Sequence, residues 1–451
     1  MTTPAITTLG GPAGTRQNLA PDPALPARDD LLDSALVADL LSRSLGDGRL
    51  EVTGAELVRV KYRVGQSLRV LYRLDVAGRS HLVSGRMFRH GRSAEAHRQA
   101  VQNALPSDGP WSNGLRSTAL DQSRDTVWWS FPNDRRIVGL DLVLDPARLP
   151  VTLRDKVGQW STSAVVQYAP ERCVTMRALD PADQTLAFVK CYAPDTQDLA
   201  KLAARYDFVA SQLQTADPTL RSPRPLGCSG DRHLLLLEPM PGQSWLDLDR
   251  AGAIDALRRL GRAIAVVHEA PLGDSSAVGV GQFKRLDLER VTRSGEFISQ
   301  ARPDVADAAR TLVSRLTLSP PALQEQVLLH GDCHPGNILV AGDQLSLIDL
   351  DQAGIGPAAA DICSLLARLN YGSVLRERDP ATATGMTNAF LEGYAQVRAL
   401  PDDSTLRWYT AAALLVERGV RAVNRIRASG LSKLERVIAN GHDLLDGRTG
   451  P

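Results

Sequence analysis

Strand-like patterns of apolar and polar residues dominate the first half of the chain. The runs are rich in Val, Leu, Tyr and Phe and are separated by Gly, Pro and Asp, which is typical of short β-strands. A first group of strands is predicted over residues 57–62, 68–76, 81–88 and 126–131, with a helix over 93–105. A second group is predicted over 164–168, 173–178, 186–192 and 233–237, with a helix over 199–213.

The two groups also share short sequence matches at a similar spacing. The matches are Val60-x-Tyr62 with Val166-x-Tyr168, Arg86-Met87-Phe88 with Lys190-Cys191-Tyr192, and Phe131-Pro132 with Glu238-Pro239. Such internal similarity indicates a duplicated unit. Chance resemblance between two mixed α/β segments is the alternative.

Helical spacing of apolar residues takes over in the second half. Helices are predicted over residues 254–269, 286–299, 305–316, 360–369, 386–397, 406–428 and 433–445. Near the start, residues 31–45 have the spacing of an amphipathic helix that ends before Gly46. Residues 1–29 are rich in Thr, Pro, Gly and Ala without periodicity, which predicts a disordered tail.

One polar stretch interrupts the helical half. Val327-Leu328-Leu329 leads into His-Gly-Asp-Cys-His-Pro-Gly-Asn (330–337), and a hairpin then leads to Asp349. Asp332 and Asn337 are five positions apart, which is the spacing of a kinase catalytic loop. A carboxylate for the acceptor hydroxyl, together with an Asn and an Asp for Mg²⁺, is what phosphoryl transfer requires.

This stretch resembles the aminoglycoside phosphotransferase and choline kinase family. The resemblance rests on His-Gly-Asp-x-His-x-x-Asn, on Ile-Asp-x-Asp and on Asp361. It implies an α+β, protein-kinase-like bilobal fold, with a nucleotide-binding lobe and hinge over 156–240 and a helical lobe over 241–451. Residues 31–155 are expected to form a degenerate copy of the first lobe, because the plan of a cap before two kinase lobes is similar to that of maltokinase-type enzymes.

The resemblance also implies a role for each polar residue of the stretch. Asp332 is the expected catalytic base, and Asn337 and Asp349 are the expected Mg²⁺ ligands. Four further residues are expected to support the loop or the metal site, namely His330, His334, Asp351 and Asp361. For His334 a contact with phosphate is the alternative, and for Asp361 it is a simple helix N-terminal charge.

Nucleotide binding is expected to involve the second group of strands and the segment after it. Lys190 is the expected phosphate lysine, and Arg172 in the turn 169–172 could contact the phosphates where glycines are missing. Glu238 and Met240 are placed by position at the adenine hinge. Asp207 is the acid nearest the expected partner of Lys190, although it could equally be a solvated helix residue.

Composition narrows the class of protein. The 451 residues carry a net charge of +1, which gives no reason to expect nucleic acid or an anionic membrane as partner. An odd number of cysteines, five, without a Cys-x-x-Cys pair favours free thiols. We see no signal-peptide pattern and no apolar run of membrane-spanning length, and we expect a cytoplasmic protein. Oligomeric state is not readable from the sequence.

The sequence thus predicts a kinase that uses ATP, or alternatively GTP, with Mg²⁺ to phosphorylate a hydroxyl of a small molecule. A sugar, an amino sugar or an aminoglycoside-like polyol is the expected acceptor. Arg418, Arg421, Arg425 and Arg427 form a basic segment, which suits a neutral polyol or an acceptor with a negative group better than a polycation, and a solvated basic face is the alternative. A kinase-like binding module and a protein kinase are the alternatives.

Overall fold

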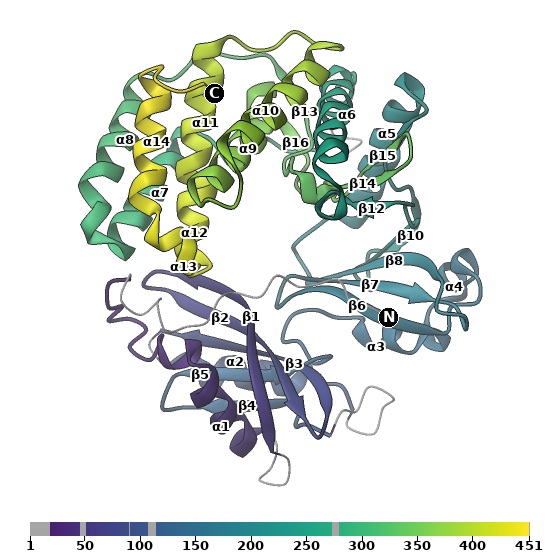
Figure 1. The fold of residues 1–451 in the computed structure, drawn as a ribbon. Helices are drawn as coiled ribbons and strands as arrows, with labels where there is room; N and C mark the ends of the chain where they lie inside the picture. The colour runs from purple at the N-terminus through teal and green to yellow at the C-terminus, as the bar shows by residue number, and fades with distance from the viewer. Residues whose placement is uncertain (1–18, 46–50, 90, 107–113, 273–278, 451) are drawn as a thin grey trace. The chain divides into compact units, whose positions relative to one another are not determined.

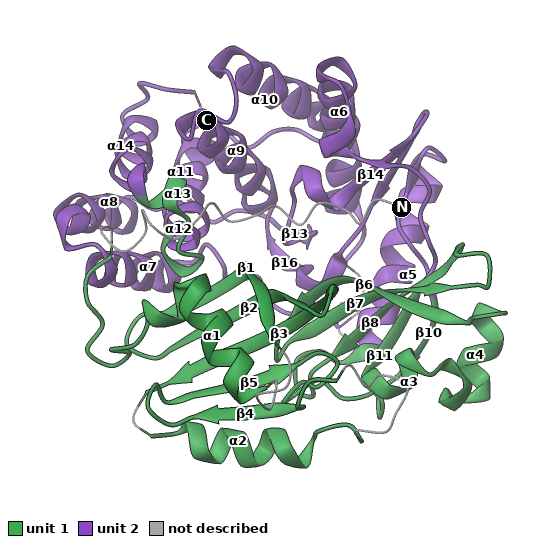
Figure 2. Ribbon diagram, turned by 60° about the horizontal axis from the view of Figure 1, so that its bottom comes forward, with its two compact units in different colours: residues 1–199, 226–237, 423–431 green, residues 200–225, 238–422, 432–451 purple. Residues whose placement is uncertain are grey.

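The computed structural model of the chain describes residues 19–45, 51–89, 91–106, 114–272 and 279–450. These residues divide into two compact units, shown in different colours in Figure 2. Unit 1 comprises residues 1–199, 226–237 and 423–431. Unit 2 comprises residues 200–225, 238–422 and 432–451.

The first sheet of unit 1 contains five antiparallel strands in the order β1-β2-β3-β5-β4 (Figure 1). Its strands are β1 (Val52–Arg63), β2 (Ser67–Val76), β3 (Arg79–Phe88), β4 (Thr118–Asp121) and β5 (Thr126–Ser130). Helix α1 (Ser34–Ser44) packs on β1, and α2 (Ser93–Gln102) packs on β4 and β5. The Asp33 carboxylate accepts hydrogen bonds from two backbone N–H groups and so caps α1.

The second sheet of unit 1 has the strand order β10-β11-β8-β7-β6. Its strands are β6 (Thr162–Ala169), β7 (Cys173–Leu179), β8 (Thr185–Tyr192), β10 (Pro225–Ser229) and β11 (Leu234–Leu237). Taken from β6, the order is that of the first sheet: three sequential strands, then the last strand, then the one before it. The predicted duplication requires this shared topology. The role of the first sheet as a cap stays a prediction.

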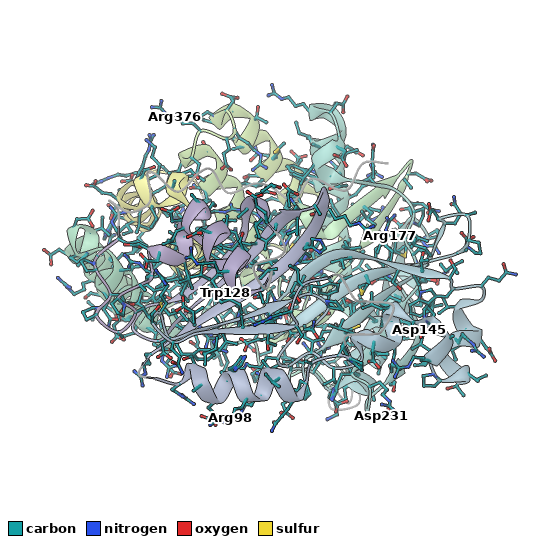
Figure 3. All side chains as sticks on the ribbon, turned by 90° about the horizontal axis from the view of Figure 1, so that it is seen from below. Arg98, Trp128, Asp145, Arg177, Asp231 and Arg376 are labelled. Carbon is teal, nitrogen blue, oxygen red and sulfur yellow. The ribbon has the colours of Figure 1, made fainter. Side chains whose placement is uncertain are left out.

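Both sheets contribute to one hydrophobic core in unit 1. Leu71 of the first sheet lies in the same buried cluster as Val174, Val189 and Leu234 of the second. Two short helices that the sequence did not predict, α3 (Leu140–Leu144) and α4 (Val151–Val157), add apolar side chains to it. In Figure 3 the side chains of Arg98 and Asp231 lie at the periphery, whereas Trp128 is fully buried.

The predicted disordered tail is wrong for its described part, residues 19–29. Leu19 and Leu25 are buried, and the buried Asp22 carboxylate accepts a hydrogen bond of 2.7 Å from the Tyr62 hydroxyl. Composition was misleading here because two buried leucines and one hydrogen bond to Tyr62 of β1 are enough to order a Pro-rich segment. Residues 1–18 lie outside the described residues.

Unit 2 is mainly helical, as predicted, and the α+β class is confirmed for the chain. Its longer helices are α5 (Leu199–Ala216), α6 (Arg250–Glu269), α7 (Leu288–Ala301), α8 (Ala306–Leu318), α9 (Ala358–Val374), α10 (Pro380–Ala395), α11 (Asp403–Ala413) and α14 (Leu434–Leu445). Helices α6 and α10 cross closely at two glycines. A Cβ on Gly261 would lie 2.0 Å from the Phe390 carbonyl oxygen, and one on Gly393 would lie 1.9 Å from that of Arg258.

The predicted helix over 406–428 is wrong as a single element. Helix α11 ends at Ala413, a π-helical segment runs over Leu414–Gly419, and the short helices α12 (Val420–Asn424) and α13 (Ala428–Ser432) follow. Apolar periodicity cannot reveal a π-turn, because the turn adds one residue without changing which residue types are buried. The part of the basic segment around Arg425 belongs to unit 1, whereas Arg418 and Arg421 belong to unit 2.

Four short strands of unit 2 form the order β12-β14-β15-β9, and two others pair as β13-β16. They are β9 (Leu220–Arg221), β12 (Gln243–Ser244), β13 (Gln326–Leu329), β14 (Ile338–Ala341), β15 (Gln344–Leu347) and β16 (Gly354–Pro357). Among the described residues, no helix has the length and apolar character needed to cross a membrane.

Candidate active site

Two strand pairs of unit 2 position the predicted catalytic loop. The loop 330–337 leaves the end of β13, which pairs with β16, and enters β14, which pairs with β15. The N–H of Ile348 donates to the carbonyl oxygen of Asn337 at 2.9 Å, so the hairpin continues one step beyond its strands. Asn337 and Asp349 therefore stand at the same end of the β14–β15 hairpin, next to the loop that carries Asp332.

Asp361 holds the start of this loop. Its buried carboxylate accepts hydrogen bonds from the N–H groups of His330 (2.6 Å) and Gly331 (2.9 Å). Gly331 has a φ of +76°, and a Cβ there would lie 2.0 Å from the Gln352 carbonyl oxygen, so the turn requires glycine. These contacts give Asp361 a bracing position, and it also lies in the first turn of α9, where a negative charge is favourable.

His268, which the sequence did not single out, lies beside Asp361. Its Nε2 is 3.4 Å from the Asp361 carboxylate and its Nδ1 is 2.8 Å from the Tyr394 hydroxyl. Burial alone would raise the pKa of Asp361, but the hydrogen bonds from His268 and from the Gly331 N–H contribute to lowering that pKa below its ordinary value. The brace is therefore an ionised carboxylate inside unit 2.

His330 links the catalytic loop to the strand before Asp349. Its Nδ1 accepts from the Asp332 N–H at 3.2 Å, which leaves the proton on Nε2 to donate to the Ile348 carbonyl at 3.0 Å. The fully buried imidazole thus supports the loop, as expected for this residue. Burial raises the pKa of the neighbouring Cys333 thiol, so this thiol stays protonated.

The Asp332 carboxylate faces a cation and an imidazole. Its Oδ1 is 3.4 Å from Nη1 of Arg285, and its Oδ2 is 3.7 Å from Nε2 of His334. Burial favours the protonated acid, but the charges of His334 and Arg285 outweigh it and lower the pKa of Asp332 to about 2. Burial, together with the nearby Arg368 guanidinium, lowers the pKa of His334, which leaves Arg285 as the cation in contact with Asp332 at neutral pH.

Arg285 links Asp332 to charged residues of the π-helical segment. Nη1 of Arg285 is also 3.3 Å from a carboxylate oxygen of Glu417, whose other oxygen accepts from Ser364 Oγ at 2.7 Å and Arg418 at 3.0 Å. Glu417 and Arg418 are both buried. Arg418 is thus part of an internal ion pair and not of an exposed basic face, because the π-turn directs it inward with Glu417.

Asp349 and Asn337 carry the side chains that could hold a metal. The amide Nδ2 of Asn337 donates to the Asp332 carbonyl at 3.0 Å, which turns its Oδ1 away from that bond. Asp349 has a left-handed backbone with φ +67°, a strained conformation that is common at functional sites. One amide and one carboxylate oxygen fit Mg²⁺, which takes its remaining ligands from phosphates and water.

Next to Asp349, Tyr206 holds the following turn. Its hydroxyl accepts from the Leu350 N–H at 3.1 Å and lies 3.4 Å from Oδ1 of Asp351. Asp351 therefore contacts a buried tyrosine of α5, which agrees with a supporting position. Among the described residues, no group of three or more His, Cys, Asp or Glu side chains could hold a metal by itself.

The predicted nucleotide residues are divided between the units. Lys190 lies in unit 1 on β8, between Thr175 of β7 and Leu235 of β11, and is only 8% exposed. Arg172 is exposed in the turn between β6 and β7. In unit 2, the Glu238 N–H donates to the Arg224 carbonyl at 3.0 Å, so at this predicted hinge residue only the carbonyl is left to face a base. Met240 is partly buried two residues later.

Asp207 has another partner than the one considered for it. Its carboxylate pairs with Arg224 at 2.5 Å and its side chain is 60% exposed. This contact favours a helix-surface acid over a partner of Lys190. Arg224 lies in the segment before β10. Its contact with Asp207 of α5 could not be predicted from distance along the chain.

Comparisons with known proteins address the family directly. Residues 183–400 match the family described as phosphotransferase enzyme family. These residues belong to the phosphotransferase family. The predicted family is therefore confirmed, and the matched segment contains every predicted site residue except Arg172.

Several characterised proteins share part of this segment. The chain is similar to homoserine kinase of Rhizobium johnstonii, with 30% identity over 182 residues, or 39% of this chain and 53% of that protein. It is 25% identical over 190 residues to aminoglycoside 3′-phosphotransferase of Streptomyces fradiae, covering 39% and 65% of the two chains. It is also 25% identical over 193 residues to a Salmonella typhimurium protein named serine/threonine protein kinase, covering 41% and 57%. The chain thus spans little more than half the length of the first relatives, 53% and 57%.

Among solved structures, a macrolide 2′-phosphotransferase of Brachybacterium faecium aligns with a TM-score of 0.45 and 17% identity. The alignment covers 66% of this chain and 98% of that one.

Proposed function

We propose that this protein is an ATP-dependent phosphotransferase that transfers the γ-phosphate to a hydroxyl group of a small molecule. The observation that carries the proposal is the Asp332 carboxylate, held by Arg285 on a loop braced by Asp361, beside Asn337 and Asp349 on one hairpin end. The match of residues 183–400 to the phosphotransferase family supports it.

Asp332 acts as the base in this proposal. As the acceptor oxygen forms its bond to the γ-phosphorus, its proton passes to Asp332, and the bond from that phosphorus to the β-phosphate oxygen breaks to release ADP. The low pKa of Asp332, about 2, keeps the carboxylate ionised at neutral pH, so it orients the hydroxyl before it accepts the proton. His330 and Asp361 keep the loop in place.

The remaining roles follow from the donor atoms. Asn337 and Asp349 would hold Mg²⁺, which when bound neutralises charge on the phosphate oxygens. Lys190 would contact the phosphates, the carbonyl of Glu238 and the N–H of Met240 would meet the base, and Asp351 would support Asp349. ATP is the proposed nucleotide and GTP the alternative, which a direct comparison of the two decides.

For the acceptor we propose a polyhydroxylated molecule, such as a sugar or amino sugar, that is not a polycation. Arg368 on α9 supports this choice. Burial, followed by the charges of Arg418 and Arg421, lowers the pKa of Arg368 to about 9. The negative charge of Asp332 partly offsets this decrease, because it raises the pKa of Arg368. Among the described residues, Nη1 of Arg368 is buried without a hydrogen-bond partner. A hydroxyl or anionic oxygen of the acceptor would supply the missing partner, and the guanidinium would repel an ammonium group placed beside it, which disfavours a polycation.

The test is release of ADP from ATP across a panel of sugars, amino sugars, aminoglycosides and amino alcohols. We expect one class to stimulate release, and Asp332→Asn to lower the stimulated rate by at least about a hundredfold. Asp343→Asn, an exposed acid in the turn of the same hairpin, is the matched control and should keep the wild-type rate. Stimulation that survives Asp332→Asn would remove Asp332 from the mechanism.

Two other functions give different results in the same experiments. A protein kinase, favoured by the relative of that name, would place labelled phosphate on protein instead of on the small molecules. A nucleotide-binding module would show a thermal shift with Mg-ATP, reduced in Asp349→Ala, but no stimulated ADP release. Absence of any shift in the wild type would contradict both the enzyme and the module.

A further inference from the structure

The first sheet of unit 1 carries basic side chains across one face. Arg59, Lys61 and Arg63 alternate along β1, so their side chains point to the same side. Lys61 pairs with Arg69 of β2, and Arg69 pairs with Arg86 of β3. Three cations therefore stand directly opposite one another across three strands. Like charges in such cross-strand positions destabilise a sheet.

These side chains line a pocket of about 160 Å³ within unit 1. Its cationic lining residues include Arg59, Lys61, Arg63, Arg69, Arg86 and Arg172. Arg425 also lines it, and its guanidinium donates to the Val60 carbonyl at 3.4 Å. No Asp or Glu is among the described residues that line this pocket.

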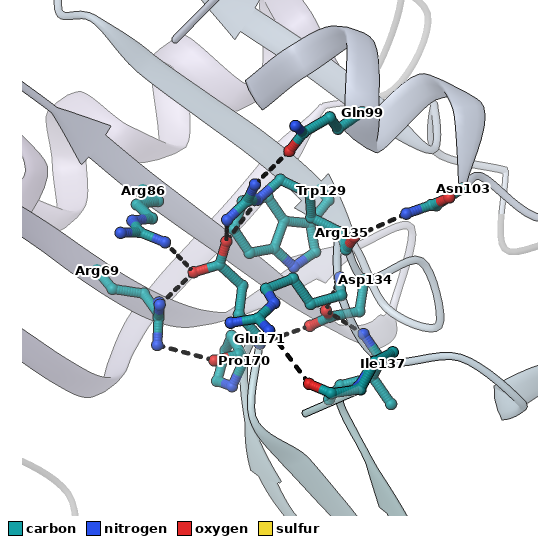
Figure 4. A network of polar contacts seen from close by, with 12 residues as sticks. Arg69, Arg86, Gln99, Asn103, Trp129, Asp134, Arg135, Ile137, Pro170 and Glu171 are labelled. Atoms are coloured by element: carbon teal, nitrogen blue, oxygen red, sulfur yellow. Dashed lines mark hydrogen bonds and ion pairs between the residues drawn. The ribbon is translucent and has the colours of Figure 1, made fainter. Parts of the chain in front are cut away.

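A single carboxylate compensates part of this charge from behind. Figure 4 shows Arg69, Arg86 and Arg135 converging on Glu171, whose side chain is fully buried. Arg86 approaches the carboxylate to 2.7 Å. One negative charge thus faces three positive ones.

Glu171 does not compensate every cation or satisfy every N–H donor around it. The Nε–H groups of Arg69 and Arg86 are buried without a hydrogen-bond partner among the described residues. Lys61, Arg63 and Arg172 form no ion pair with any described residue. A cavity lined by uncompensated positive charge focuses a positive potential on its interior.

We propose that this pocket is a binding site for a phosphate group of a small molecule other than the nucleotide. Guanidinium forks match phosphate oxygens, and an anion would compensate the uncompensated cations while it separates the like charges. The pocket volume of about 160 Å³ is below the roughly 300–1,000 Å³ of drug-sized sites and suits a phosphate group better than a whole nucleotide. The inference concerns unit 1 and does not rest on the proposed function.

The state of Lys61 agrees with this assignment. Burial, followed by the charges of Arg425, Arg63, Arg172 and Arg59, lowers the pKa of Lys61 to about 8. The carboxylate of Glu171, in the β6–β7 turn, is paired with Arg69, Arg86 and Arg135. The cationic lining of the pocket is therefore electrostatically unfavourable for Lys61, and a bound phosphate would reverse that.

The test uses inorganic phosphate as the probe and calorimetric titration of the full chain in a chloride buffer. The titration is done without nucleotide and again with saturating Mg²⁺ and a nonhydrolysable ATP analogue. We expect phosphate to bind under both conditions. The double variant Lys61→Gln, Arg63→Gln should weaken binding by at least about tenfold. Arg79→Gln, which removes an exposed cation of β3 outside the pocket, is the matched control and should bind as the wild type does.

Three outcomes would overturn the proposal. They are no phosphate binding by the wild type, loss of binding when the ATP analogue is present, and unchanged binding by the double variant. Loss with the analogue would assign phosphate to the nucleotide site. Lys61→Gln alone serves as a second variant if the double variant does not fold, since it leaves no ion-pair partner behind. Because the first titration needs neither nucleotide nor turnover, its result is separate from that of the ADP-release assay.

Discussion

Asp361 in unit 2 and Glu171 in unit 1 are both buried carboxylates that hold a tight turn, but their partners differ. Asp361 accepts two backbone N–H groups of the loop before Asp332 and faces one histidine. Glu171 faces three arginines and sits in the β6–β7 turn with a φ of +60°. Asp361 therefore holds the backbone of a loop, whereas Glu171 forms ion pairs with guanidinium groups.

The turn around Glu171 explains why an acid occupies a conformation that glycine or asparagine usually takes. Its N–H donates to the buried Asp134 carboxylate at 2.9 Å, and Asp134 also accepts from the Tyr168 hydroxyl at 2.6 Å. The side chain then reaches the arginines of the first sheet. Residues with positive φ persist where several contacts impose the conformation, and here those contacts join the two sheets of unit 1. The difference shows that the Asp361 carboxylate fixes the conformation of a loop, whereas the Glu171 carboxylate leaves a net positive charge around itself.

Glu171→Gln should have the largest effect on stability of the variants that test this comparison. The variant leaves three arginines without their counter-charge, and loss of one partner of a buried ion pair should lower the free energy of unfolding by about 3 kcal/mol. Urea denaturation followed by circular dichroism measures the change. The control is Glu56→Gln, which breaks the more exposed pair of Glu56 with Arg73 and should cost less than about 1 kcal/mol. Equal losses in the two variants would show that the Glu171 cluster contributes no more than a surface ion pair.

Asp361→Asn should have the next largest effect, and a different kind of effect. The amide has one acceptor oxygen where two backbone N–H groups need acceptors, so one buried donor stays unsatisfied, at a cost of about 2 kcal/mol. Because these donors belong to the loop of Asp332, kcat should fall while KM for the nucleotide changes little. Steady-state kinetics with the best acceptor of the panel measures both.

The control for Asp361→Asn is Asp379→Asn at the N-terminus of α10. Asp379 caps that helix through the Thr382 N–H, and Asn is an equally good capping residue, so stability and kcat should stay near wild type. If Asp361→Asn lowers stability but leaves kcat unchanged, Asp361 supports the fold of unit 2 without controlling the loop.

The comparison also shows which features a sequence can reveal. The loop with Asp332, Asn337 and Asp349 was predictable because its chemistry requires polar residues at fixed spacing between apolar runs. The strands around Lys190 were predictable from alternation alone, and the equal strand order of the two sheets agrees with the matched residues. In each case the pattern that predicts the feature lies within a short stretch of the sequence.

Contacts between distant segments gave no such signal. Glu171 meets Arg69 and Arg86 from positions 102 and 85 residues away, and Arg285 reaches Glu417 across 132 residues. Asp207 was considered for Lys190 because only chain distance was known, whereas Arg224 binds it. The alternation of Arg59, Lys61 and Arg63 is visible in the sequence. Their meeting with Arg172 and Arg425 depends on a fold that local periodicity does not specify.

The smallest expected effect is a gain in stability, which follows from the positive charge beside Glu171. Lys61 has a pKa of about 8 in the folded chain, below the value of about 10.4 for an unfolded lysine. Between these values the unfolded chain binds a proton that the folded chain lacks, so stability rises with pH. Below about pH 8 the lysine is charged in both states, and its repulsion by the surrounding arginines acts fully against folding.

Lys61→Gln should therefore raise the free energy of unfolding at pH 7 by up to about 1 kcal/mol, since it removes one of the facing like charges. The gain should shrink as the pH rises from 7 to 9.5, because the wild-type lysine loses its charge over that range. Denaturation in phosphate-free buffer at both pH values measures it, with Arg79→Gln as the control that should show no such trend. A Lys61→Gln variant that is less stable than wild type at pH 7 would mean that the lysine already has a stabilising partner. The charge left beside Glu171 would then need no external anion to balance it.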